Sequence, residues 1–176
     1  MSVTNSIGSI YGLPETTLEK FIPRLYPQEE SGRCLGGYSS MTGFLNHGES
    51  LQNSVNNDRK ALQERKISYR AITQKLKYLI SKATQISKST LVDQKFRVEI
   101  DEPTIGKQFC PFSPASNNNA NKFAPIENAC GSGDRDISIT NTTNNKTIKF
   151  GSLLLHLIEE HHFFEGQVPY RLNPQD

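Results

Sequence analysis

The chain has 176 residues and a formal net charge of +2, which arises from 20 basic and 18 acidic side chains. This length suits one domain, or one domain with an appendage, and a chain of this size buries a sizeable core without help from a metal. The nearly balanced charge argues against a nucleic-acid-binding protein and against a protein that binds anionic membrane surfaces.

The first residues have neither the basic nor the apolar region of a signal peptide, and no apolar run reaches the roughly 18 residues of a membrane-spanning helix. Three cysteines are present, and an odd number without a secretion signal is typical of reduced thiols or metal ligands. No general base can be paired with Cys34, which favours a free thiol there. We therefore expect a cytoplasmic protein, although export by a route without a signal peptide stays open, including delivery of a bacterial protein into a host.

Apolar residues at helical spacing predict three helices in the first half. A first helix ends at Pro27, and a glycine-rich loop spans residues 28–48. A second helix is predicted over 50–65. The strongest signal follows Ser68, a favourable N-cap, where apolar residues recur on one helical face. The two later helices, joined by a short break, predict an antiparallel αα-hairpin in a mainly helical part, 1–90. The apolar face of the last helix consists of Tyr69, Ile72, Leu76, Leu79, Ile80 and Ala83.

Strand patterns dominate the second half. Residues 95–100 alternate between apolar and polar side chains, which predicts a half-buried strand. Two further alternating runs, 136–140 and 147–150, flank an Asn-rich turn and predict a β-hairpin. A last helix is expected from about Ser152 to the residue before Gly166, a favourable position for ending a helix.

The combined pattern predicts an α+β fold. An N-terminal helical part packs on a small C-terminal unit of one β-hairpin and one helix, with one extra strand, and together they form one compact unit. The C-terminal part covers residues 91–176 and contains an Asn- and Pro-rich loop of more than twenty residues. A loop of that length is unusual in a compact domain unless something holds it in place.

Histidines and cysteines gather in this C-terminal part. Three of the four histidines lie within seven residues of one another, and two of the three cysteines precede them. Zinc prefers four Cys and His ligands in a tetrahedral array, and two histidines separated by four residues on a helix match half of a ββα zinc finger. The cysteine half does not match, because nineteen residues separate the two cysteines. The candidate zinc ligands are Cys110, Cys130, His156 and His161, with His162 or Glu160 as substitutes.

The helical geometry leaves the metal hypothesis open. On an ideal helix His156 and His161 lie about 140° apart, so sharing one ion requires the last turn to tighten or unwind. In the alternative interpretation, His161 is a buried core residue that is hydrogen-bonded through one ring nitrogen to a carbonyl. His156 and His162 would then be surface residues beside two glutamates.

Two functional hypotheses follow from these residues. The first is a non-enzymatic binding or interaction protein with an unidentified protein partner and a structural zinc site. The second is a metal-dependent hydrolase that uses His156, Glu160 and His161 around an open coordination position. Either Glu159 or Asp134 would act as its base. The histidine spacing does not match the metalloprotease patterns, which require histidines four positions apart.

Aromatic residues follow the predicted last helix closely. Phe164 lies near the centre of its apolar face and is expected in the core. Phe163 lies about 140° away on an ideal helix, so either the following segment folds over it or it stays exposed. An exposed Phe163 beside Tyr170 would form a patch for binding a protein partner.

Three short segments resemble a known family: CPF at residues 110–112, HLIEEHHFFEG at 156–166 and PYRLNP at 169–174. In these segments the chain is similar to small uncharacterised bacterial proteins that share a Cys-Pro-Phe element, an Ile-x-Asn strand, a His-Leu-Ile-x-x-His-x-Phe-Phe-Glu-Gly helix and a closing Pro-Tyr-Arg. The resemblance covers about 105–174, with a fainter similarity at 43–51. It carries no known activity. It implies that a set of residues belongs together, namely His156, His161, Phe163, Phe164 and Gly166.

Overall fold

The computed structural model describes residues 22–27, 42–86, 89–103, 107–113 and 129–174. Of the first predicted helix, only α3 (Ile22–Leu25) falls within these residues. Cys34 and most of the glycine-rich loop lie outside them. Among the helices of the described residues, none combines the length and the apolar character needed to cross a membrane.

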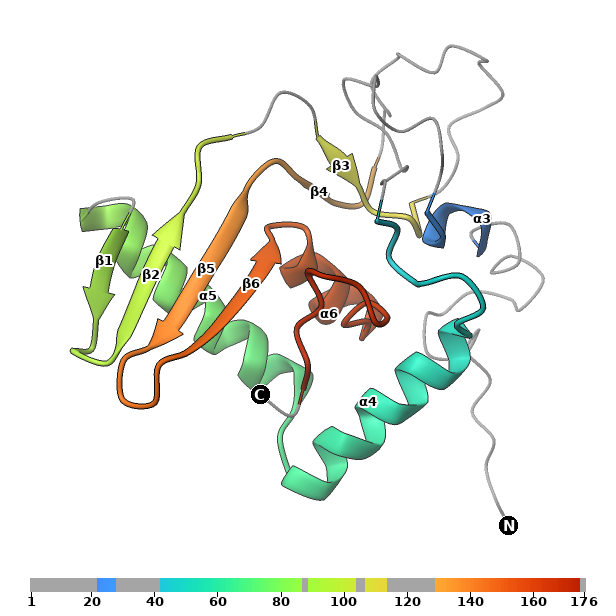
Figure 1. Cartoon of the computed structure of the whole chain (residues 1–176), viewed down its shortest axis with the longest axis horizontal. Coiled ribbons are helices and arrows are strands. Elements are labelled where there is room, and N and C mark those ends of the chain that lie inside the picture. The colour runs from blue at the N-terminus through green and yellow to red at the C-terminus, as the bar shows by residue number, and fades with distance from the viewer. Residues whose placement is uncertain (1–21, 28–41, 87–88, 104–106, 114–128, 175–176) are drawn as a thin grey trace.

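A four-stranded antiparallel sheet forms the centre of the fold (Figure 1). The order of its strands in space is β1-β2-β5-β6, so two hairpins lie side by side and join through β2 and β5. Two short strands, β3 (Gln108–Phe109) and β4 (Ser132–Gly133), form a separate antiparallel pair. The predicted α+β class, with helices preceding most of the strands, is confirmed. The strands of the larger sheet are β1 (Ser89–Val92), β2 (Phe96–Ile100), β5 (Asp136–Asn141) and β6 (Lys146–Gly151).

Strands form where apolar and polar residues alternate. Val98 of β2 and Ile137 and Ile139 of β5 are buried, whereas the residues next to them along each strand are half-buried or exposed. The predicted strand and the predicted hairpin are confirmed. The prediction missed β1, because its four residues show no clear alternation. Its turn also contains no glycine, and Asp93 and Gln94 take the positive φ angles instead.

The two long helices begin where the sequence provides a cap. The helices are α4 (Leu51–Arg65) and α5 (Tyr69–Ile86). The hydroxyl oxygens of Ser50 and Ser68 each accept a hydrogen bond from a backbone N–H of the first turn, at 3.4 and 3.1 Å. Lys66 ends α4 in the left-handed conformation, with φ of 56°. Both predicted helices are therefore confirmed within a few residues.

The apolar face of α5 covers the sheet. Leu76, Leu79 and Ala83 are buried in the same core cluster as the inward side chains of β2 and β5, and Ile72 and Ile80 are half-buried at its edge. The main contacts of α5 are with β1, β2 and α6. The predicted antiparallel hairpin of helices is not formed as expected, because α4 and α5 extend in different directions from their junction (Figure 1).

The last helix ends earlier than predicted. α6 (Leu154–His161) stops because His162 takes a left-handed conformation with φ of 53°. The backbone N–H of Phe163 then donates to the carbonyl of Leu157, six residues earlier, at 3.1 Å, and so satisfies one of the last carbonyls of the helix. Gly166 is needed for a different reason. A Cβ atom at that position would lie 2.2 Å from the Glu49 carboxylate.

The segment after α6 packs against the first helical part. We name residues 165–172 the strap. The backbone N–H of Gly166 donates to the carbonyl of Phe44 at 2.7 Å. The backbone N–H of Gln167 donates to both carboxylate oxygens of Glu49, at 2.9 and 3.0 Å. The strap is therefore hydrogen-bonded to the segment that directly precedes α4.

A buried ion pair fixes the strap to α4. The Arg171 guanidinium donates to the carboxylate of Asp58, and these side chains are 11% and 3% exposed. Arg171 also donates to the backbone carbonyl of Glu165. Burial raises the pKa of Asp58, and the charge of Arg171 opposes that shift. The second carboxylate oxygen of Asp58 has no hydrogen-bond partner within the described part of the chain.

Glu165 should make the stability of the protein depend on pH. Burial raises the pKa of its carboxyl from the ordinary 4.5 to about 8, and the charge of Arg171 only partly opposes the shift. Because the folded pKa is the higher one, the stabilising effect is complete below pH 4.5 and is lost as the pH rises to about 8. The free energy of unfolding should fall by up to roughly 1.4 kcal/mol per pH unit in that window, relative to Glu165→Gln. Denaturant unfolding of both proteins at several pH values tests this, and parallel curves would contradict it.

Candidate metal centre

The two cysteines are brought together by the smaller sheet. Cys110 directly follows β3 (Gln108–Phe109), and Cys130 lies just before β4 (Ser132–Gly133). The backbone N–H of Cys110 donates to the carbonyl of Gly131 at 2.9 Å and extends the pairing of the two strands. Cys110 and Cys130 are therefore close to each other in space, although nineteen residues separate them in the sequence.

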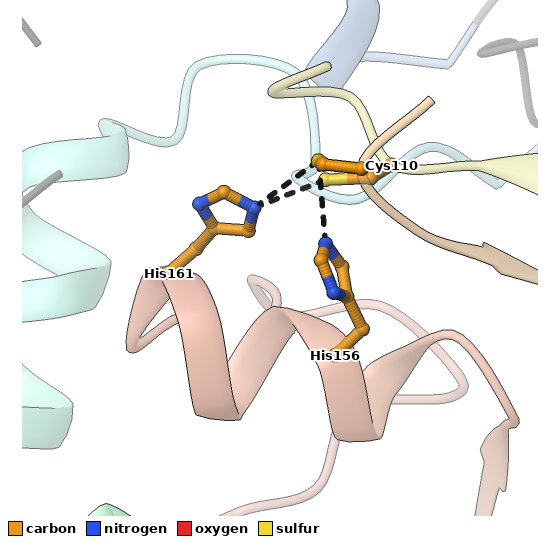
Figure 2. Close-up of side chains that lie close together, drawn as sticks. Cys110, His156 and His161 are labelled. Carbon is orange, nitrogen blue, oxygen red and sulfur yellow. Dashed lines mark hydrogen bonds between the residues drawn. The ribbon is translucent and has the colours of Figure 1, made fainter. Parts of the chain in front are cut away.

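The two histidines approach from α6. Figure 2 shows the rings of His156 and His161 pointing away from the helix toward the sulfur atoms. The ring centroids lie 5.0 Å apart and the ring planes are 76° from parallel. α6 remains an α-helix through His161, so the helix does not have to unwind to bring the rings together. The two residues lie far apart around the helix axis, but their side chains point toward each other and bring the rings into contact.

Three sulfur–nitrogen distances between the ligand atoms are close to those around a single tetrahedral ion. The Nε2 atom of His161 lies 3.3 Å from Cys110 Sγ and 3.7 Å from Cys130 Sγ. The Nε2 atom of His156 lies 3.4 Å from Cys130 Sγ. All four ligand atoms lie within 4.8 Å of one another. Around a tetrahedral zinc ion, sulfur and nitrogen ligands lie about 3.6 Å apart. The four side chains can therefore hold a metal ion.

A serine hydroxyl supports the sulfur of Cys130. Ser113 is fully buried, and its Oγ accepts the backbone N–H of Cys130 at 3.0 Å. The same Oγ lies 3.2 Å from Cys130 Sγ. Either atom can be the donor in this second contact, but a thiolate has no hydrogen, so the hydroxyl would donate to the sulfur of a deprotonated Cys130. A hydroxyl that donates to sulfur stabilises the thiolate, which is the form that binds a metal.

The turn that carries Cys110 is held from two sides. The Arg24 guanidinium of α3 donates to the carbonyl of Ser113 at 2.9 Å. The ring of Phe112 lies 4.8 Å from the ring of His161 and 5.7 Å from that of Phe163, measured between centroids. These contacts position one ligand histidine against the turn of one ligand cysteine.

Two glycines allow the hairpin to approach α6 closely. A Cβ atom on Gly131 would lie 2.4 Å from the ring of His156. A Cβ atom on Gly133 would lie 2.4 Å from the backbone nitrogen of Leu153. Real Cβ contacts are not this short, so any other residue would push the hairpin away from the helix.

Burial disfavours the charged forms of two ligand groups, Cys110 and His161. It raises the pKa of the Cys110 thiol, and the nearby Cys130 sulfur adds to that shift. It lowers the pKa of His161 to about 4, with added repulsion from His156 and His162. Neutral imidazoles present a lone pair to a metal, and a bound dication would favour the thiolates over the thiols.

The two substitute ligands lie outside the cluster. His162 stacks on Tyr69 with centroids 4.2 Å apart, on the side of α6 that faces α5. Glu160 is exposed and is not one of the grouped ligand atoms. The structure therefore brings together the four residues first selected and neither of the substitutes.

The residues considered as a hydrolytic base have other partners. Glu159 forms an ion pair with Lys77 of α5. Asp134 pairs with Arg135, whose guanidinium keeps the pKa of that carboxyl below its usual value. Four protein ligands also complete a tetrahedral shell, which leaves no open position for water.

The predicted patch for a protein partner is not formed as expected. Two alternatives were open for Phe163, and the structure has the buried one: the residue is fully buried and forms no exposed patch with Tyr170. The physical reason is the early end of α6, which turns the chain inward before this residue. Phe164 is also fully buried, as predicted. Tyr170 is half-buried, and the Lys149 ammonium lies 5.6 Å from the centre of its ring.

The residues that surround the ligands could not be identified from the sequence. Ser113 follows the Cys-Pro-Phe element, and Gly131 follows the second cysteine directly, but neither position carries a recognisable spacing signal. Arg24 lies 89 residues before the carbonyl of Ser113 that it contacts, so no local pattern could reveal it.

No protein-family model matches this chain, and neither does any curated protein or solved structure. The function of the chain therefore cannot be inferred from similarity to a characterised protein. The geometry of the four-residue cluster is the feature from which a function can be inferred.

Proposed function

We propose that Cys110, Cys130, His156 and His161 bind one zinc ion with a structural role. One observation carries the proposal: four ligand atoms from two separate parts of the fold lie within 4.8 Å of one another. Two sulfur and two imidazole nitrogen ligands form a donor set that zinc prefers. When bound, zinc would supply a positive charge that stabilises both thiolates and joins the small hairpin to α6.

A structural role is favoured over a hydrolytic one by the residues themselves. The donor set is complete at four, and the acidic residues of the hydrolase hypothesis are exposed or paired elsewhere. We further propose that the protein acts by binding a protein partner and that zinc keeps the surface around the β3–β4 hairpin in place. The zinc would thus stabilise the conformation of the protein and would not take part in a reaction.

Metal analysis tests the proposal directly. Purified protein that is refolded with zinc should retain one equivalent per chain after gel filtration, measured by elemental analysis. Cobalt should replace zinc and produce the visible absorption of a tetrahedral ion together with thiolate charge-transfer bands. Cys110→Ser and His161→Asn should each lose the metal. His47→Ala is a matched control, because His47 is exposed and is not in the cluster. Retained zinc in the ligand variants would contradict the assignment.

A steric test compares one glycine beside the site, Gly131, with one glycine at the edge of the sheet, Gly151. Gly131→Ala should push the His156 ring out of position and weaken zinc binding by at least about tenfold, the range found for changes around metal ligands. Gly151→Ala is the control, since a Cβ there meets no atom within 4 Å. Competition with a chromogenic chelator measures both affinities. Equal affinities would show that the hairpin does not have to approach α6 to bind the ion.

A further inference from the structure

We propose that Cys110 and Cys130 form a reversible disulfide when a hydroperoxide reaches the site, and that this oxidation releases the metal. The inference rests on the proposed zinc site, because it describes how the occupancy of that site is controlled. It assigns separate roles to the two sulfurs: Cys130 reacts first, and Cys110 completes the disulfide.

The two sulfurs differ sharply in their access to solvent. Cys130 is exposed, whereas Cys110 is fully buried. A dissolved peroxide can therefore reach the first sulfur and not the second. Cys130 Sγ also lies 3.2 Å from the Ser113 hydroxyl, which would donate to the sulfur once the thiol has lost its proton. Accessible thiolates beside a second cysteine are the ones that peroxides oxidise reversibly.

The second sulfur is already close enough to react. Both Sγ atoms belong to the group whose members lie within 4.8 Å of one another. A disulfide has an S–S length of about 2.05 Å, so the sulfurs have to approach by less than about 3 Å. Rotation of the exposed Cys130 side chain can supply this movement. The hydrogen bond from Cys110 N to Gly131 O, at 2.9 Å, holds the backbone of both cysteines in place.

The reaction is balanced with one peroxide per site. The Cys130 thiolate attacks the O–O bond, an S–O bond forms, and the O–O bond breaks to release hydroxide. The resulting sulfenic acid is attacked by the Cys110 sulfur, so an S–S bond forms and a second hydroxide leaves. Two protons convert the hydroxides to water. The cysteines lose two electrons, and the peroxide gains them.

Oxidation should also change how the hairpin is held. A disulfide has no thiolate to offer, so the ion would keep only the two histidines and dissociate. His156 and His161 would no longer be tied to the hairpin through a metal. Residues 108–113 and 130–133 would then be held to the rest of the fold by fewer contacts, chiefly the hydrogen bond from Arg24 and the packing of Phe112 against the rings of His161 and Phe163.

The experiment uses the full chain with Cys34→Ala, so that only the two site cysteines remain. Zinc-loaded protein is treated with hydrogen peroxide, and released zinc is followed with a chromogenic chelator. We expect one zinc released per chain, the loss of about 2 Da in the intact mass, and one Cys110–Cys130 linked peptide after proteolysis. Dithiothreitol followed by zinc should restore the starting protein.

Two variants separate the roles of the sulfurs. In Cys110→Ala, Cys130 should accumulate as a sulfenic acid that a 1,3-dione traps. In Cys130→Ala, oxidation of the buried Cys110 should be at least about tenfold slower, as expected when access limits reactivity. If either variant fails to fold, the peptide map of the two-cysteine protein still decides the question.

The outcomes distinguish this inference from the zinc proposal. Zinc-loaded protein whose cysteines resist peroxide, or gain oxygen separately without forming the linked peptide, would overturn the inference and leave the zinc site intact. Protein that binds no zinc but forms the linked peptide would overturn the zinc proposal and retain the disulfide. Equal oxidation rates of the two single-cysteine variants would contradict the assigned order of reaction.

Discussion

Removal of zinc should lower the melting temperature by roughly 10 °C, if the metal was present at about 1,000 times its dissociation constant. An ion that binds only the folded state at that excess contributes about 4 kcal/mol. For a chain of this length each kcal/mol corresponds to about 2–4 °C. The loss stays well below total unfolding, because Leu154, Leu157 and Ile158 anchor α6 in the main core independently of the metal.

The effect should also be local. Hydrogen exchange should increase most in residues 108–113 and 130–133, which belong to the hairpin that the metal joins to α6. It should increase less in α6 and remain unchanged in α4. The Cys110→Ser variant is the control, because a chelator should have no further effect on its melting temperature. A uniform increase across α4 and the sheet would show that the ion supports the whole fold and not one corner of it.

Replacement of Arg171 by methionine should destabilise the protein by about 3–5 kcal/mol, the cost of leaving a buried charge without its partner. Asp58 is only 3% exposed and already has one carboxylate oxygen without a hydrogen-bond partner among the described residues. Methionine retains most of the apolar stem, so the loss reports mainly on the ion pair. The effect should shrink at low pH, where the carboxyl of Asp58, whose pKa is raised by burial, takes up a proton.

A double-mutant cycle separates the pair from its surroundings. Asp58→Asn combined with Arg171→Met should cost much less than the sum of the single changes, since neither charge is then left alone. Lys75→Met is the exposed control. Lys75 pairs with Asp93 at 3.3 Å, with side chains 49% and 43% exposed, and its loss should cost at most about 1 kcal/mol. Additive single changes at Asp58 and Arg171 would mean that the ion pair contributes nothing specific.

Periodicity and capping predicted much of the fold from the sequence alone. β2 and the β5–β6 hairpin follow strict alternation, and α4 and α5 begin at Ser50 and Ser68. These features depend on neighbouring residues, so the sequence displays them directly. The C-terminal end of α6 could not be predicted in the same way, because His162 takes a conformation that glycine usually supplies.

The candidate ligands could be selected from the sequence only because few cysteines and histidines were available. Their assembly could not be predicted, since the spacing of Cys110 and Cys130 matches no finger pattern and the ideal helix separates His156 from His161. In the structure, the pairing of the short strands β3 and β4 brings the two cysteines together. The side chains of the two histidines point toward the same two sulfur atoms. The support from Ser113 depends on tertiary packing and has no counterpart in local sequence.

The strap has a consequence for the order in which the protein assembles during synthesis. Asp58 and Arg171 are 113 residues apart, and Glu49 and Gln167 are 118 residues apart. When α4 leaves the ribosome, its buried carboxylate has no counter-charge, and its end has no strap to cover it. At a chain growth of about 5–20 residues per second, Asp58 waits roughly 5 to 25 seconds before Arg171 is synthesised. During that interval the apolar surface that the strap covers in the folded protein stays exposed, which is the condition that makes incompletely folded chains prone to aggregation.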